Sequence, residues 1–164
     1  MTTPLEVKQM SKPFAALAAS MWLALGATAL AQDKPLPVTT LVIDTDHGPH
    51  TFRVEIAADH PSQEKGLMFR KQMAPDAGML FEFPKPEMEY FWMKNTILPL
   101  DIIFIRANGT ISSIAPNAVP YSTTTIPSVE PVRAVLELNG GRAAQLGIEP
   151  DAVVHHAFFG NALR

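Results

Sequence analysis

The chain contains no cysteine among its 164 residues, and this absence limits how the fold can be stabilised. Without a thiol there is no disulfide bond, and there is no cysteine to carry a lipid at the end of a leader segment. The folded part must therefore rely on packing alone. A single domain of this length buries enough apolar surface to be stable without cross-links.

Positive charge is also scarce, with 13 Lys and Arg residues against 16 Asp and Glu residues. The formal net charge is −3, and no block of basic residues occurs in the sequence. Proteins that bind nucleic acid or anionic lipid usually present a basic patch to the phosphates. The composition therefore argues against both kinds of partner.

A long hydrophobic run occurs near the N-terminus, at Phe14–Leu30. It follows Lys8 and Lys12 and ends at Ala29-Leu-Ala31, which matches the small-x-small pattern of a signal-peptide cleavage site. The run is shorter than the roughly 20 apolar residues of a membrane-spanning helix. We therefore predict that residues 1–31 are a cleaved signal peptide and that the protein is exported, periplasmic or extracellular. A retained N-terminal anchor is the alternative.

Cleavage after Ala31 would leave a mature protein of 133 residues. The leader takes Lys8, Lys12 and Glu6 with it, so 11 basic and 15 acidic residues remain and the net charge becomes −4. Residues 32–37, which include two prolines, are predicted to form a short linker. We predict one domain over residues 38–164, with no stable membrane anchor after cleavage.

Short β-branched and alternating segments, separated by turn residues, dominate this predicted domain. They predict an α+β fold that is mostly antiparallel β: a single β-rich domain, as a partly closed barrel or sandwich, with about two short helices. Two segments that are apolar on both faces, 91–93 and 102–105, are expected in central strands. The predicted strands are 38–43, 50–56, 79–83, 89–94, 100–105, 111–114, 132–138 and 152–158. Asn108-Gly109 is a two-residue hairpin signal between two of them. One helix is predicted from an N-cap at Asp59 or Ser62 to about Phe69, and another within 139–147.

Several sequence blocks carry a resemblance to a known family. The most specific is Phe91-Trp-Met-Lys-Asn-Thr96, followed by Pro99-Leu-Asp-Ile102; the others are Gly66-Leu-Met-Phe-Arg70, Gly78-Met-Leu-Phe81 and Val135-Leu-Glu-Leu138 before two glycines. Together they resemble the "domain of unknown function 192" family of small, often exported prokaryotic proteins. The resemblance implies a compact β-rich domain and brings no established activity or catalytic residue.

Four polar residues interrupt the most apolar part of the chain: Lys94, Asn95, Thr96 and Asp101. A buried polar group without a partner costs on the order of 1–3 kcal/mol, so each of these must find a partner or a ligand. In one interpretation they bond to the backbone around a turn at Leu98-Pro99. In the other, Lys94 and Asp101 form a pair that lines a pocket with Asn95 and Thr96.

Arg70, directly after the predicted first helix, is the fifth candidate. Its planar guanidinium suits a carboxylate or phosphate ligand, although an arginine at this position more often caps a helix end. The leading hypothesis is an exported small-ligand-binding or accessory module whose pocket lies under the proline-rich loop 116–131. The donors on these side chains favour a small anionic or polyhydroxylated ligand.

Other functions remain open at this point. Asp101 as general base, with Lys94 as electrostatic stabiliser, would define a hydrolase or lyase. The loop 116–131 could instead dock on an unknown protein partner. Five methionines favour either core packing or copper handling, namely Met68, Met73, Met79, Met88 and Met93. The histidines, at positions 47, 50, 60, 155 and 156, lack metal-ligand spacing, so no metal and no cofactor are predicted.

Overall fold

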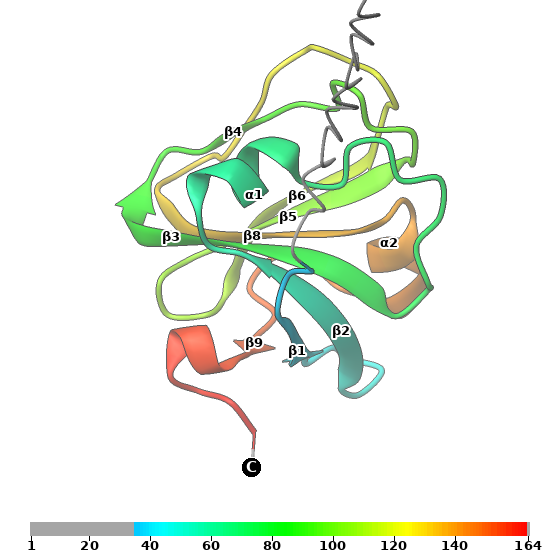
Figure 1. The fold of residues 1–164 in the computed structure, drawn as a ribbon. Coiled ribbons are helices and arrows are strands. Elements are labelled where there is room, and N and C mark those ends of the chain that lie inside the picture. The colour runs from blue at the N-terminus through cyan, green and yellow to red at the C-terminus, as the bar shows by residue number, and fades with distance from the viewer. Residues whose placement is uncertain (1–34, 164) are drawn as a thin grey trace, which may run out of the picture. The chain divides into compact units, whose positions relative to one another are not determined.

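A computed structural model describes residues 35–163, which lie in one compact unit (Figure 1). The predicted signal peptide lies outside the described residues. Within residues 35–163 no helix is long and apolar enough to cross a membrane.

Nine strands, two short α-helices and one 3-10 turn make up the described part of the chain. In chain order they are β1 (Val38–Ile43), β2 (His50–Ala57), α1 (His60–Lys65), β3 (Ala77–Glu87), β4 (Tyr90–Phe91), β5 (Leu100–Ile105), β6 (Ile111–Ala118), β7 (Ile126–Pro127), β8 (Val132–Asn139), α2 (Arg142–Leu146), β9 (Val154–His155) and the 3-10 turn η1 (Ala157–Phe159).

Seven of these strands form one sheet in the order β6-β5-β8-β3-β2-β1-β9. Every neighbouring pair is antiparallel except β2 and β3, which are parallel. The sheet is strongly curled, as a half-barrel, and α1 covers one of its faces (Figure 1). The predicted fold class, mostly antiparallel β with two short helices, is confirmed.

The two faces of the sheet carry separate apolar cores, as alternation along β8 shows. Leu136 and Leu138 belong to the larger core, together with residues of β1, β2 and α2. Val135 belongs to the second core, under β4 and the segment that follows α1. Since successive side chains of a strand point to opposite faces, Glu137 falls on the same face as Val135. A charged residue therefore occupies a position in the second core.

The prediction that 91–93 lies in a central strand is wrong. Only Tyr90 and Phe91 form a strand, β4, and it pairs with β7 in a separate two-stranded ribbon. Trp92 is 50% exposed, whereas Phe91 stacks edge-on against Phe81 and packs on the second core. The run is therefore not buried on both faces: Phe91 and Met93 pack on the second core, whereas Trp92 lies at the surface.

The other central strand is confirmed. Every residue of β5 is buried, and β5 lies between β6 and β8. The hairpin predicted at Asn108-Gly109 joins β5 to β6, with Gly109 at φ 84°. Positive φ at this position suits glycine, which lacks the Cβ that disfavours it.

Both helices occur where they were predicted, but α1 is shorter. Asp59 is its N-cap, and the Asp59 carboxylate accepts from the backbone N–H of Ser62 at 2.8 Å. The helix ends at Lys65 rather than near Phe69, because Gly66 takes a positive φ of 46°. The final predicted strand, 152–158, is also shorter and gives way to η1 after His155.

Candidate functional site

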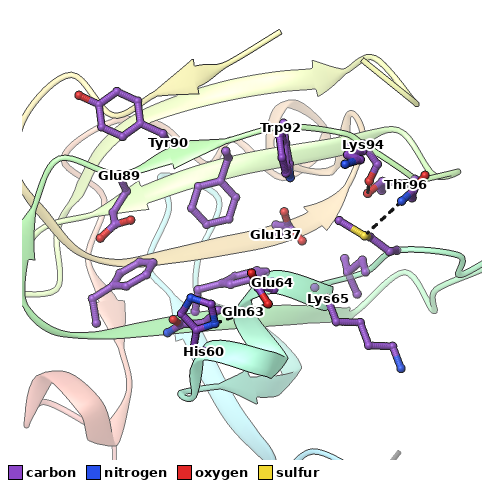
Figure 2. A pocket seen from close by; sticks show the side chains of 17 residues that line it. His60, Gln63, Glu64, Lys65, Glu89, Tyr90, Trp92, Lys94, Thr96 and Glu137 are labelled. Carbon is purple, nitrogen blue, oxygen red and sulfur yellow. Dashed lines mark hydrogen bonds and ion pairs between the residues drawn. The ribbon is translucent and has the colours of Figure 1, made fainter. Parts of the chain in front are cut away.

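A cavity of about 650 Å³ lies on the face of the sheet that carries the second core. Helix α1 forms one wall, and β4 with the turn that follows it forms the opposite wall (Figure 2). The volume falls within the roughly 300–1,000 Å³ range typical of small-ligand sites. Its lining includes phenylalanines on β3 and β4, acidic residues, and the turn formed by Lys94, Asn95 and Thr96.

Glu137 of β8 lies in the middle of this lining (Figure 2). Its strand neighbours are Met79 on β3 and Ile102 on β5, both fully buried. The close approach of β3 depends on Gly78, because a Cβ there would lie 2.6 Å from the Glu137 carbonyl oxygen. The sheet thus holds one carboxyl in an apolar surface that faces the cavity.

The Glu137 side chain is buried and unpaired. The residue is 5% exposed, and within residues 35–163 its carboxyl has no hydrogen bond and no ion pair. Burial raises the pKa of Glu137 to about 8, with a smaller opposing effect from the positive charge of Arg70. At neutral pH the group is therefore a neutral acid, which can both donate and accept a hydrogen bond. Buried carboxyls with a strongly raised pKa occur preferentially at functional sites.

Glu137 was not among the predicted site residues, although a signal was present in the sequence. The strand around it consists otherwise of apolar residues on both faces, apart from Arg133 near its start and Asn139 at its end. A single acidic residue in such a strand must be paired, neutral or functional. Which of the three applies depends on the residues of the neighbouring strands, β3 and β5, and these strands are distant from β8 in the sequence.

Three of the five predicted site residues line the cavity: Lys94, Asn95 and Thr96. Their polar groups make weak contacts. The Lys94 Nζ lies 5.1 Å from the centre of the Trp92 ring, and the Asn95 Nδ2 lies 3.8 Å from the sulfur of Met68. The Thr96 hydroxyl reaches the Lys94 carbonyl only at 3.4 Å, which is a poor hydrogen bond. All three side chains thus keep donors available for a ligand, and ligand binding by them stays a prediction.

Asp101 is placed elsewhere. It is fully buried and does not belong to the cavity lining within the described residues. One carboxylate oxygen accepts from the backbone N–H groups of Asn117 (2.8 Å) and Gly141 (2.9 Å), and the other accepts from that of Ala143 (2.7 Å). These bonds tie β5 to the end of β6 and cap the N-terminus of α2. Asp101 therefore acts on the backbone, as the first interpretation holds, although its partners are not those around Leu98-Pro99.

Arg70 also lies outside the cavity lining. Its guanidinium makes a two-pronged ion pair with Glu55 of β2, and the second of these bonds measures 2.7 Å. The fork that was predicted to receive a ligand is therefore occupied by a carboxylate of the protein. Its remaining influence on the cavity is electrostatic, through the pKa of Glu137.

Replacing Arg70 with methionine should raise the pKa of Glu137 above about 8. The reason is that the substitution removes the positive charge that opposes the burial effect and leaves the negative charge of Glu55 unpaired. A carboxyl-carbon NMR titration of glutamate-labelled protein measures this directly. Arg53→Met is the matched control, because Arg53 is an exposed residue on the same strand as Glu55. An unchanged or lower pKa in the Arg70 variant would show that the two groups are not coupled.

A second carboxyl and two exposed aromatic rings complete the wall opposite α1. Burial, and secondarily the nearby Glu87, raises the pKa of Glu89 above its ordinary value. Tyr90 is 65% exposed and Trp92 is 50% exposed, and both line the cavity. The cavity therefore combines flat apolar rings with carboxyls, of which those of Glu89 and Glu137 have a raised pKa.

The structure gives little support to a metal site or to copper handling by the methionines. Within residues 35–163 no group of three or more His, Asp or Glu side chains is placed to hold a metal ion. Met79 and Met93 are fully buried in the second core, whereas Met68 is a cavity residue. Core packing is therefore the better explanation for the methionines at these two positions.

Residues 41–156 match the family model DUF192, described as "Uncharacterized ACR", and the chain belongs to this family. A search of curated proteins found no match. One similar solved structure is a "putative transcription regulator" from Sinorhizobium meliloti 1021, with 44% identity over 77% of this chain and 99% of that chain and a TM-score of 0.75. Another is a protein of unknown function from Novosphingobium aromaticivorans DSM 12444, with 45% identity over 74% of this chain and 86% of that chain and a TM-score of 0.72.

Proposed function

We propose that this chain is an exported small-ligand-binding module and that its ligand is a neutral polyhydroxylated molecule, such as a sugar, held in the cavity around Glu137. The observation that carries the proposal is the buried carboxyl of Glu137, which has no partner within the described residues and faces open space. A protein gains nothing in stability from such a group, because its burial disfavours the charged form. The signal-peptide pattern in the leader supports export.

The mixture of groups favours a neutral ligand over an anionic one. Glu64, Glu89 and Glu137 all line the cavity, and an anion would have to approach three carboxyls. Below their raised pKa values the last two of these carboxyls can donate to hydroxyl oxygens, and Lys94, Asn95 and Thr96 add further donors. Trp92 and Tyr90 offer flat apolar faces on which the C–H face of a sugar ring can pack. A polyhydroxylated ring satisfies both kinds of surface.

An enzymatic role is the second candidate, and it involves a different residue from the one predicted. Asp101 is buried and bonded to three backbone N–H groups, so the geometry does not support it as a general base. A carboxyl with a pKa of about 8 is instead suited to act as a general acid near neutral pH, which favours Glu137 for this role. Hydrolysis of nitrophenyl glycosides that is lost in Glu137→Gln would support catalysis over binding alone.

The binding proposal predicts a specific difference between two substitutions of Glu137. Glu137→Leu should lower the affinity for the bound sugar by about tenfold or more, because it removes a buried hydrogen-bonding group. Glu137→Gln should retain most of the affinity, because an amide also donates and accepts. The measurement is titration calorimetry with a panel of glucose, galactose, mannose, N-acetylglucosamine and their disaccharides.

The matched control is Glu149→Leu, which removes an acidic side chain from outside this cavity and should leave the affinity unchanged. Affinity of the unmodified protein should also fall above pH 8, where Glu137 loses its proton, whereas that of the Gln variant should not. The proposal fails if no sugar of the panel binds, or if the Leu variant binds as tightly as the unmodified protein.

A further inference from the structure

Two exposed aromatic residues flank the turn that closes one end of the cavity. The backbone N–H of Phe69 donates to the carbonyl of Asn95 at 2.9 Å, and that of Tyr121 donates to the carbonyl of Thr96 at 3.1 Å. Neither belongs to the cavity lining, yet both are fastened to residues that do. The segment 119–125, between β6 and β7, thus reaches the site through Tyr121.

Phe69 and Tyr121 have a backbone conformation that costs free energy, and their exposed rings gain little from packing in the domain. Phe69 has a φ of 64° and Tyr121 a φ of 62°, in the left-handed region that bulky side chains rarely adopt. Asn95 between them has a φ of 58°. Phe69 is 65% exposed and Tyr121 is 61% exposed, so neither ring gains from burial in the domain. Backbone strain of this kind concentrates at ligand-binding and switch regions.

Two further exposed aromatic residues belong to the cavity wall itself. Tyr90 and Trp92 are large and exposed, and the Lys94–Thr96 turn follows them along the chain. The carbonyls of Asn95 and Thr96 in this turn accept from the backbone N–H groups of Phe69 and Tyr121. Four exposed aromatic residues are therefore joined to this turn through the chain or through hydrogen bonds.

We propose that the ligand is a linear glycan chain rather than a single sugar, with one unit in the cavity and the following units on Phe69 and Tyr121. This inference rests on the proposed function, since it needs a sugar in the cavity. A neutral glycan suits the surface because its rings present apolar C–H faces to aromatic side chains while its hydroxyls stay in water. A single sugar would leave the two strained aromatic residues without a role.

The test compares chain lengths. Titration calorimetry with N-acetylglucosamine oligomers and glucose β-1,4 oligomers of one to six units should show, in at least one series, an affinity gain of about tenfold or more from the monomer to the tetramer. In the double variant Phe69→Gly, Tyr121→Gly this gain should be lost, while the affinity for the monomer stays the same. Glycine is chosen because it accepts positive φ without strain, so the melting temperature should not fall.

Val129→Gly is the control, because Val129 is 70% exposed and belongs to neither the cavity nor the turn. It should keep the gain with length. The inference is overturned if a monomer binds as tightly as its oligomers, or if the double variant keeps the full gain. Failure of every length to bind would instead remove the proposed function itself, which distinguishes the two outcomes.

Discussion

Asp101→Ala should destabilise the protein by about 3–5 kcal/mol, because three backbone N–H groups, of which that of Ala143 is buried, would lose the fully buried carboxylate that they share. For a domain of this size the loss corresponds to a fall in melting temperature of roughly 10–20 °C. Helix α2 should be the first element to open, because its N-cap residue, Gly141, has no side chain to replace the carboxylate. Thermal melts followed by circular dichroism measure the effect.

Asp76→Asn provides the matched control for Asp101, since Asp76 also bonds to α2. Its carboxylate pairs with Arg142 at 2.5 Å; the Asp76 side chain is 66% exposed, and that of Arg142 is 18% exposed. Asparagine keeps an oxygen that can accept from Arg142, and an ion pair with one exposed partner contributes about 1 kcal/mol, so this variant should melt within a few degrees of the unmodified protein. If Asp101→Ala melted equally close to it and instead lost ligand binding, Asp101 would belong to the site and not to the scaffold.

Glu137 should make the protein less stable as the pH rises. Its carboxyl has an ordinary pKa of 4.5 in the unfolded chain and a pKa of about 8 in the folded protein. Between these values the unfolded chain loses the proton while the folded protein keeps it, so the free energy of unfolding falls with increasing pH. Its contribution is complete below about pH 4.5 and is lost by about pH 8, with a total on the order of 3–5 kcal/mol.

Glu137→Gln isolates this contribution from the other titrating groups. The variant should melt at nearly the same temperature as the unmodified protein at pH 4.5 and roughly 10 °C higher at pH 8. Glu89→Gln is the matched comparison: burial also raises the pKa of Glu89, but less of that side chain is withdrawn from water. Parallel melting curves for the Gln variant and the unmodified protein across this pH range would show that Glu137 ionises normally.

The sequence predicted the parts of the fold that depend on local patterns. The apolar, β-branched run of β5, the turn at Asn108-Gly109 and the helix cap at Asp59, one of the two predicted positions, all depend on a few neighbouring residues, and each occurs in the structure. The place of β4 could not be found in this way. Its partner is β7, which lies about 35 residues later along the chain, and hydrophobic periodicity does not specify a partner.

The residues predicted to form one site lie in different places in the structure. The polar cluster at 94–96 lines the cavity, although the sequence predicted a strand up to residue 94 and not a turn there. Asp101, five residues later, belongs to the same cluster in sequence, yet it points toward α2, because it lies on the face of β5 opposite to Leu100 and Ile102, which pack in the second core. Glu137 could be recognised as a candidate site residue only from the structure. Its burial between β3 and β5, and its lack of a partner within the described residues, are properties of the tertiary structure.

Carboxyl-carbon NMR of Glu137, with and without sugar, tests the central claim most directly. The resonance can be assigned by its absence from the spectrum of Glu137→Gln. We predict that it titrates near pH 8 in the free protein and that, at neutral pH, it shifts on addition of a saccharide that binds. A resonance that titrates near 4.5, or one that does not move when the protein is saturated with the saccharide, would contradict the claim that a protonated Glu137 receives the ligand.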